Sequence, residues 1–282
     1  MAIKKYKPTS AGRRHMSGID YRKVLTSKEP YKPLTKGRKR AAGRSSSGRI
    51  SVRHKGGGHK RLWREVDFKY NKKDVPAKLE TVEYDPNRSA FIGIALYADG
   101  ERRYVVVPKG MQAGDKFVVS EDAKVELGNR LPLNKMPVGT FVYNIELKPG
   151  SGAKIARSAG NFAEVLAHDS GYTHLKMPSS EIRKVPSTCW ATVGAASNDE
   201  HKLVVVGKAG RSRHMGIRPT VRGAAMNPVD HPHGGGEGKA GRGHRRQRTK
   251  WGKPAGKGQK TRKKKKYSNK LIVRRRKVGK RR

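Results

Sequence analysis

Positive charge is concentrated at the two ends of this 282-residue chain, and this segregation limits what the chain can fold into. Residues 1–60 have a net charge of +16 and residues 201–282 a net charge of +26, whereas residues 61–200 have a net charge of only +2. Like charges at this density repel one another and disfavour a compact state unless a polyanion neutralises them. The two ends are also poor in hydrophobic residues and rich in glycine, so we expect them to be disordered alone and ordered on RNA.

The composition of the whole chain excludes several other classes of protein. A formal net charge of +44 and a pI near 10.8 are typical of a nucleic-acid-binding chain. No stretch approaches the ~18 apolar residues of a membrane span, and no apolar signal-peptide core follows Met1. The single cysteine, Cys189, has no partner for a disulfide or for a CxxC zinc site, which fits a reducing compartment. We therefore expect an intracellular protein with no membrane partner, no cofactor and no metal ion.

The nearly neutral middle of the chain has the period-two hydrophobic pattern of β-strands. Residues 91–97 and 103–107 flank Asp99 and Gly100, a dipeptide that suits the tight turn of a hairpin. Further strands are predicted at 79–84, 116–119 and 124–127 and, after Pro137, at 140–147, 162–167, 172–176, 182–185 and 189–193. Short strands at regular spacing favour two small closed barrels divided near residues 128–137. Small barrels often bind oligonucleotides, which agrees with the charge of the chain.

Residues 43–60 form the first segment whose composition suggests chemistry. Cations alternate there with glycine and serine, which lets backbone amides and basic side chains reach phosphate groups together. The segment contains no Gly-Lys-Ser/Thr sequence, so it is not the phosphate loop of a nucleotide-binding protein. A flexible linker into the first barrel is the alternative interpretation.

Residues 226–238 gather Asp230, His231, His233 and Glu237 close together, as an acid–base site or a metal site would. The glycines that follow His233 would let the backbone pass very close to another molecule. Proline separates the two histidines and no further ligand is evident, so the sequence favours zinc only weakly. We favour hydrogen bonding of these side chains to bases, riboses or water over a catalytic role.

The cations of residues 260–266 and 274–276 are less specific, since such runs also occur in localisation signals and nonspecific arms. Three functions remain open on the residues alone. They are a structural RNA-binding protein, an enzyme that uses His231 as a general base, and a nucleoid-type DNA-binding protein.

Long and specific motifs extend along nearly the whole chain. They lie at residues 7–10, 12–15, 56–60, 83–90, 156–160, 218–223, 226–238 and 271–276. In these motifs the chain resembles the bacterial large-subunit ribosomal protein L2 family. The resemblance implies a mainly β fold, with an OB-like barrel followed by an SH3-like barrel and long basic extensions at both ends. The expected division is a basic N-terminal rRNA-binding extension at 1–60, the OB-like barrel at 61–130, the SH3-like barrel at 131–200 and a Gly-rich C-terminal rRNA-binding extension at 201–282.

The resemblance also implies a function. Members of the family are structural constituents of the large ribosomal subunit and primary rRNA-binding proteins, not enzymes. They support subunit association, tRNA binding and the region of the peptidyl transferase centre. The implied partners are large-subunit rRNA, small-subunit rRNA across the subunit interface, tRNA and other ribosomal proteins, and the implied location is the ribosome in the cytoplasm.

Particular residues take their expected roles from the same resemblance. Arg88 and Arg157 match arginines that anchor the two barrels on rRNA, and Asp230 and His231 match a loop once proposed to assist peptide-bond formation. We assign no catalytic residue. The expected RNA-binding residues are Arg44, Arg49, Arg53, His54, Lys55, His59, Lys60, Arg88, Arg157, Arg218, Arg222, Asn227, Asp230, His231, His233, Arg242, Arg262, Arg274 and Arg275.

Overall fold

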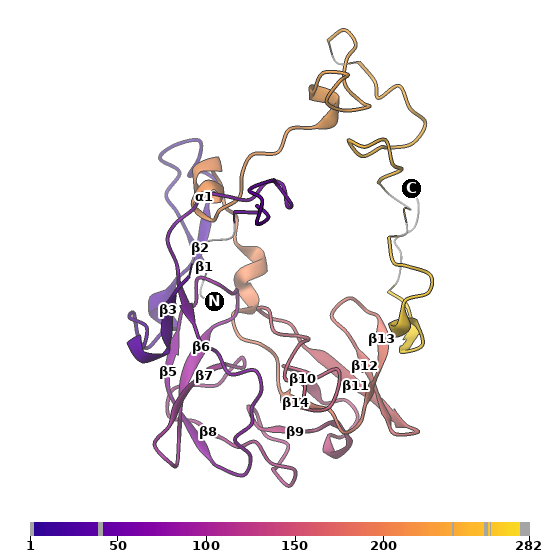
Figure 1. Ribbon diagram of the computed structural model, residues 1–282. Helices are drawn as coiled ribbons and strands as arrows, with labels where there is room; N and C mark the ends of the chain where they lie inside the picture. Colours follow the sequence, from indigo (N-terminus) through magenta and orange to yellow (C-terminus); the bar gives the residue numbers. More distant parts are fainter. Residues whose placement is uncertain (1–2, 39–41, 239, 257–258, 260, 277–282) are drawn as a thin grey trace. The chain divides into compact units, whose positions relative to one another are not determined.

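Strands dominate the fold of this protein. The computed structural model describes residues 3–38, 42–238, 240–256, 259 and 261–276 (Figure 1). The chain divides into two compact units. Unit 1 consists of Met1–Arg40, Lys60–Lys208 and Lys270–Arg282, and unit 2 of Ala41–His59 and Ala209–Asn269. Both large sheets belong to unit 1, whereas unit 2 contains turns, single β-bridges and the short helix α1 (Ala209–His214).

The first large sheet has the strand order β7-β6-β5-β8, and all of its pairs are antiparallel. Its strands are β5 (Ala77–Glu83), β6 (Ile92–Tyr97), β7 (Arg102–Val106) and β8 (Lys116–Phe117). The predicted hairpin at Asp99 and Gly100 is confirmed, because β6 pairs with β7 across this turn. Gly100 has a φ of +83°, a backbone conformation that residues with a side chain rarely adopt. Glycine therefore closes the hairpin at the one position that needs it.

The second large sheet has the order β15-β13-β12-β11-β10-β14-β9. Its strands are β9 (Arg130–Pro132), β10 (Phe141–Tyr143), β11 (Ala163–Asp169), β12 (Tyr172–Lys176), β13 (Ile182–Pro186), β14 (Trp190–Val193) and β15 (Ile272–Arg274). Five of them, β10 to β14, agree with strands predicted from the alternating pattern, and the bounds of β12 agree at both ends. The expected strand at 140–147 is shorter, because Asn144 takes a positive φ of 50° directly after β10.

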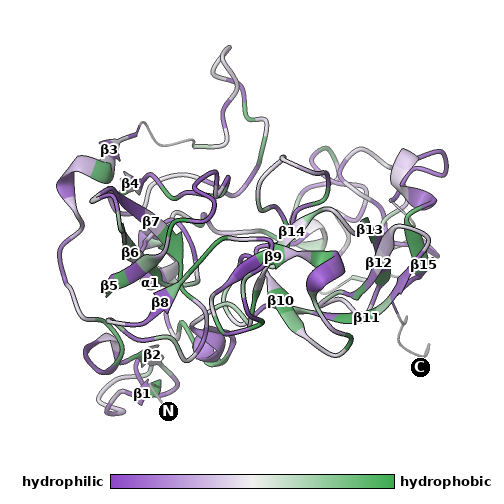
Figure 2. Cartoon of the chain, turned by 90° about the horizontal axis from the view of Figure 1, so that it is seen from below, coloured by the Kyte–Doolittle hydropathy of each residue, from purple (hydrophilic) through white to green (hydrophobic). Residues whose placement is uncertain are grey.

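Each large sheet buries its own hydrophobic cluster. Along β5, buried Ala77 and Leu79 alternate with exposed Lys78 and Glu80, as expected for a strand with one face toward a core. Figure 2 shows the hydrophobic segments within the strands and the hydrophilic ones in many of the connecting loops. The first cluster includes Leu79, Phe91, Tyr97, Val105, Phe117 and Val119. The second includes Leu131, Val142, Tyr143, Val165, Leu175 and Val185.

A buried ion pair lies where the two clusters meet within unit 1. Arg130 and Glu146 are 1% and 3% exposed, and their charged groups lie 3.4 Å apart. Arg130 also donates to the carbonyl of Asn144 at 2.7 Å and to the hydroxyl of Thr192 at 3.2 Å. Its guanidinium carbon lies 4.5 Å from the centre of the Tyr70 ring, which belongs to the first cluster. These contacts satisfy a charge that would otherwise be costly to bury.

One predicted strand is wrong. Residues 124–127 form no strand, and Val125 and Leu127, which the alternating pattern would place in the core, are 40% and 42% exposed. The backbone turns back on itself here, with the amide of Glu126 donating to the carbonyl of Lys124 at 2.8 Å. The strand β9 instead begins at Arg130, inside the segment expected to divide the two barrels.

The basic ends contain backbone pairing that their composition did not predict. In the N-terminal part, β1 (Ile3–Lys5) pairs with β2 (Ser17–Ile19), and β3 (Thr35–Gly37) pairs with β4 (Leu62–Arg64). Near the C-terminus, β15 pairs with β13 and becomes the edge strand of the second sheet. Composition does not show which segments find backbone partners. β1–β2 and β3–β4 are separate two-stranded sheets, whereas β15 joins a sheet edge where partner amides and carbonyls are already in place. The remaining short 3-10 helices are η1 (Tyr21–Lys23), η2 (Lys32–Leu34), η3 (Leu133–Lys135), η4 (Asp199–Leu203), η5 (Gly223–Ala225) and η6 (Tyr267–Asn269).

Candidate nucleic-acid interface

Arg88 lies in the turn that follows β5, and the buried carboxylate of Asp85 organises this turn. Asp85 is fully buried and accepts hydrogen bonds from the backbone amide of Asn87 at 2.8 Å and from its side-chain amide at 3.1 Å. Arg88 donates from Nε to the same carboxylate at 2.5 Å. A guanidinium has five N–H donors, so this bond fixes its plane while other donors remain for a ligand.

Arg157 comes from the second barrel region, and the structure brings it to the same place as Arg88. Its guanidinium carbon lies 4.4 Å from the centre of the Phe68 ring, and that of Arg88 lies 5.3 Å from it. Arg157 also donates to the carbonyl of Ala153 at 3.2 Å, and Ala153 donates from its amide to the carbonyl of Phe68 at 2.7 Å. One aromatic ring therefore contacts two cations from distant parts of the sequence.

Phe68 is a residue that the sequence did not indicate. It stands between Asp67 and Lys69 in a segment without strand alternation, so its pattern resembles that of any partly buried aromatic residue. Its importance follows only from tertiary contacts, because the residues that meet on it are far apart in the sequence. An aromatic residue close to several cations is the weak signal that the sequence does contain.

In unit 2, the segment 43–53 forms a small closed loop. Arg44 and Ile50 form a β-bridge, and the amide of Ser45 donates to the carbonyl of Arg49 at 2.8 Å. Arg44 donates to the carbonyl of Gly48 at 3.0 Å, so part of its hydrogen-bonding capacity is used inside the loop. The expected RNA-binding side chains Arg44 and Arg49 are exposed on this loop.

The segment 54–59 lies against residues 214–218 of the same unit. Lys55 and Ile217 form a β-bridge, and the amide of Arg218 donates to the carbonyl of His54 at 3.1 Å. A side chain at Gly58 would place its Cβ 2.8 Å from the Cα of Gly216, so the close approach requires glycine. The fold thus brings together the expected RNA-binding residues His54, Lys55, His59 and Arg218 from both expected extensions.

Arg53 of this unit stacks on an exposed indole. Its guanidinium carbon lies 5.6 Å from the centre of the Trp251 ring, and the ammonium of Lys250 lies 5.0 Å from the same centre. Trp251 is 68% exposed, so one aromatic surface and two cations are open to solvent together. Such a combination can stack on a base and contact a phosphate group at the same time.

The histidine loop is held by hydrogen bonds between imidazole nitrogens and backbone amides or carbonyls. The amide of His233 donates to Nδ1 of His231 at 3.0 Å, and the amide of Arg248 donates to Nε2 of His233 at 3.0 Å. Nε2 of His244 bonds the carbonyl of Pro232 at 3.1 Å. The His231 and His233 rings lie 4.7 Å apart. The arrangement occupies these nitrogens with the loop's own backbone, which is a structural use of histidine.

Desolvation is the largest cause that lowers the pKa of His233 below the ordinary imidazole value, and the positive groups around the ring lower it further. Those groups are His231, His244, Arg242 and Arg248. The neutral form is also the form that can accept the hydrogen bond from Arg248. Asp230 and Glu237 are exposed on this loop, and Val229 beside Asp230 is 91% exposed.

The remaining expected residues are spread over both units. Lys60, Arg222, Asn227 and Arg242 are exposed. Arg262 folds back on its own segment, donating to Asn269 Oδ1 at 2.7 Å and to the hydroxyl of Ser268 at 2.8 Å. Arg274 lies in β15, and both it and Arg275 are exposed. The expected set therefore includes residues of both units.

No helix in the described parts of the chain is long and apolar enough to cross a membrane. Within the same residues, no three or more His, Cys, Asp and Glu side chains form a group that could hold a metal ion.

Comparison with protein families identifies the two large sheets. The family model "Ribosomal Proteins L2, RNA binding N-terminal domain" matches residues 31–120, which include the whole first sheet. The model "Ribosomal Proteins L2, C-terminal domain" matches residues 126–252, which include every strand of the second sheet except β15. These domains are an OB-like barrel followed by an SH3-like barrel, so the expected fold class is confirmed. The two matches together span most of the sequence, and the chain belongs to the ribosomal protein L2 family.

Proposed function

We propose that the chain anchors its two barrels on large-subunit rRNA through Arg88 and Arg157, with Phe68 holding both guanidinium groups in place. Family membership already makes the chain a structural, non-enzymatic constituent of the ribosome that binds rRNA and other ribosomal proteins. The observation that carries the proposal is the shared contact of both arginines with one ring. Two arginine planes fixed in this way can engage adjacent phosphate groups with little loss of side-chain entropy.

The basic extensions at 1–60 and 201–282 supply further rRNA contacts in this proposal, on either side of barrels at 61–130 and 131–200. Their cations account for nearly all of the net charge of the chain. In unit 2, the exposed loop at 43–53 and the Arg53–Trp251 pair offer both phosphate and base contacts. The salt dependence of binding should therefore reflect many phosphate contacts.

The finer roles of the chain belong to the same proposal. They are support of the peptidyl transferase region, subunit association through small-subunit rRNA, and tRNA binding. The loop at Asp230 and His231 supports a positioning role in RNA, because Nδ1 of His231 accepts the amide of His233 and Nε2 of His233 accepts the amide of Arg248. We therefore assign His231 to loop structure and RNA contact, and not to proton transfer.

The proposed anchors are tested by rRNA binding of the full chain across a series of salt concentrations. Arg88→Ala and Arg157→Ala should each weaken binding and lower the slope of log K against log salt by about one unit, because each removes one phosphate contact. Arg102→Ala is the matched control. Arg102 lies in the same matched domain as Arg88, and it pairs with Glu80 at 2.8 Å. Its slope should equal that of the unmodified chain.

Equal slopes for the anchor variants and the control would refute the proposed anchors. Circular dichroism of each variant checks that the barrels remain folded. A weaker affinity with an unchanged slope would also count against a phosphate contact, since it would place the effect in packing instead of charge.

A further inference from the structure

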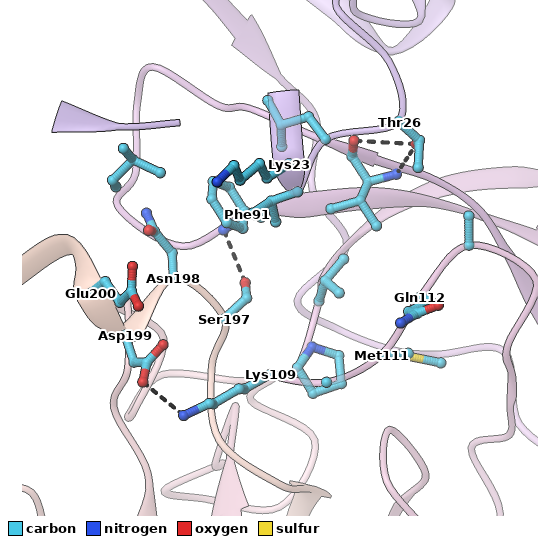
Figure 3. A pocket seen from close by; sticks show the side chains of 18 residues that line it. Lys23, Thr26, Phe91, Lys109, Met111, Gln112, Ser197, Asn198, Asp199 and Glu200 are labelled. Atoms are coloured by element: carbon cyan, nitrogen blue, oxygen red, sulfur yellow. Dashed lines mark hydrogen bonds and ion pairs between the residues drawn. The ribbon is translucent and has the colours of Figure 1, made fainter. Parts of the chain in front are cut away.

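A cavity of about 610 Å³ lies in unit 1 (Figure 3), and neither Arg88 nor Arg157 lines it. Its walls come from five parts of the chain. They are the N-terminal segment around η1, Val82 of β5, Phe91 just before β6, the loop that follows β7, and residues 197–200 at the start of η4. Its volume lies within the range of roughly 300–1,000 Å³ that is usual for ligand sites in proteins.

Hydrogen bonds between the walls hold the cavity in shape without an occupant. The amide of Thr26 donates to the carbonyl of Val82 at 3.0 Å, and the Thr26 hydroxyl donates to the same carbonyl. The amide of Phe91 donates to the Ser197 hydroxyl at 3.1 Å, and the amide of Ser197 donates to the carbonyl of Val107 at 3.1 Å. The dashed lines in Figure 3 mark the side-chain bonds of this set. An occupant therefore meets a wall that is already ordered.

Apolar side chains supply part of the inner surface. Phe91, Val107 and Met111 are buried at 3%, 2% and 8% exposure, and Val24, which also lines the cavity, is 36% exposed. Exposed Gln112 and Ala113 lie at the loop wall. A side chain that enters from solvent could bury its apolar surface against these residues, at roughly 25 cal/mol per Å² removed from water.

The charge of the lining distinguishes this cavity from the rest of the chain. Its ionisable side chains are Lys23, Lys109, Asp199 and Glu200, which sum to zero in a chain of net charge +44. Lys109 and Asp199 form an ion pair at 2.7 Å, and this hydrogen bond lowers the pKa of the Asp199 carboxyl. Asp199 therefore stays charged at neutral pH, and two neighbouring carboxylates stand at one side of the cavity.

A lining without net charge gives RNA phosphate groups none of the net attraction that the basic ends of the chain offer. A protein segment does not depend on such attraction. Lysine or arginine beside an apolar side chain would place positive charge near Asp199 and Glu200.

We propose that this cavity is the docking site for a peptide segment of another ribosomal protein, which inserts an apolar side chain and directs a flanking basic residue toward Asp199 and Glu200. The proposal uses the family membership of the chain and does not depend on the roles given to Arg88 and Arg157. It adds a protein-binding surface to a chain whose other proposed contacts are made with RNA.

Site-specific photocrosslinking in assembled large subunits tests the proposal. Benzoylphenylalanine replaces Ala113, an exposed residue of the cavity wall, in the full chain. The matched control carries the same group at Ala98, an exposed residue in the turn between β6 and β7 of the same sheet. Sedimentation first establishes that both variants are present in the subunits, and mass spectrometry then identifies the crosslinked residues.

We expect the probe at Ala113 to crosslink one segment of another ribosomal protein, with a yield at least about tenfold above the control, the ratio that ~1.4 kcal/mol of preferential binding gives. Crosslinking to rRNA would assign the cavity to RNA and overturn the proposal. A crosslink within the chain itself, equal yields at the two positions, or no crosslink in loaded subunits would overturn it as well.

A charge reversal provides the second measurement. Adding Glu200→Lys to the Ala113 probe should reduce the yield by about tenfold, because a like charge then faces the basic residue of the segment. Glu121→Lys is the control, since Glu121 is exposed, lies outside the cavity lining and changes the net charge equally. Equal yields for the two reversals would exclude the proposed charge contact.

Discussion

Arg88 and Arg157 lie over the same aromatic ring, with their guanidinium carbons 5.3 and 4.4 Å from the centre of Phe68. Each arginine comes from a different barrel region, so the ring couples the two proposed anchors. The Arg88 side chain is further fixed by the fully buried carboxylate of Asp85. We therefore expect the three side chains to behave as one unit in rRNA binding.

Phe68→Ala should weaken rRNA binding by about tenfold, because both arginines lose a cation–π contact that is worth roughly 0.5–2 kcal/mol. The effect should not add to that of Arg157→Ala, since the two residues share one contact. Filter binding of the two single variants and the double variant measures this coupling. If the two losses add fully, the ring does not position the arginine.

Arg130→Ala should destabilise unit 1 by about 3–5 kcal/mol, because it leaves the Glu146 carboxylate buried without its partner. Urea unfolding, monitored by circular dichroism, measures the change in stability. Arg102→Ala removes an arginine from a partly exposed pair with Glu80 and should cost no more than about 1 kcal/mol. Similar losses of stability for the two variants would show that burial does not make the Arg130–Glu146 pair more important for stability than an exposed pair.

The packing of the histidine loop should weaken as the pH falls. The pKa of His233 is lowered in the fold, so the unfolded chain takes up its proton first and stability is lost as the pH drops below the ordinary imidazole value. The protonated ring also cannot accept the amide of Arg248. Hydrogen exchange at 244–252, corrected for the intrinsic effect of pH, should be faster at pH 5 than at pH 7.5.

His233→Gln is the control for this measurement, because glutamine keeps an acceptor but does not titrate near neutral pH. The corrected pH dependence should disappear in this variant. Persistence of the same dependence would assign it to another group, such as His231 or His244.

His231→Ala should leave peptide-bond formation nearly unchanged in fully assembled ribosomes. A general base typically contributes ~100-fold to 10,000-fold, so single-turnover kinetics would reveal its loss clearly. His231 instead accepts the amide of His233, and the expected defect is in assembly or tRNA positioning. A rate that falls by at least ~100-fold with normal subunit assembly would establish a chemical role for this side chain.

Local signals in the sequence predicted much of the barrel region. The turn at Gly100 depends on one residue that tolerates a positive φ, and β12 depends on a regular alternation, so both were predictable. The strand expected at 124–127 was wrong because alternation alone does not supply a partner strand. β9 was missed because it is short and lies in a segment rich in proline and asparagine that favours a linker.

The candidate site was less predictable, because its geometry depends on contacts between distant residues. Arg88 and Arg157 were expected from the family resemblance, but nothing in their local sequence indicated that they meet on Phe68. The composition around His231 suggested acid–base chemistry, whereas the hydrogen bonds of its ring depend on where the loop's amides lie. Arg262 was expected to face RNA, yet its own segment takes part of its hydrogen-bonding capacity.

Sedimentation of the full chain with large ribosomal subunits through a high-salt gradient tests the central claim most directly. High salt releases weakly bound protein first, whereas a chain held by many specific contacts dissociates only at higher salt. The account predicts that the unmodified chain sediments with the large subunit, and that the Arg88→Ala, Arg157→Ala double variant is released at lower salt. Free unmodified protein at the top of the gradient would contradict the account.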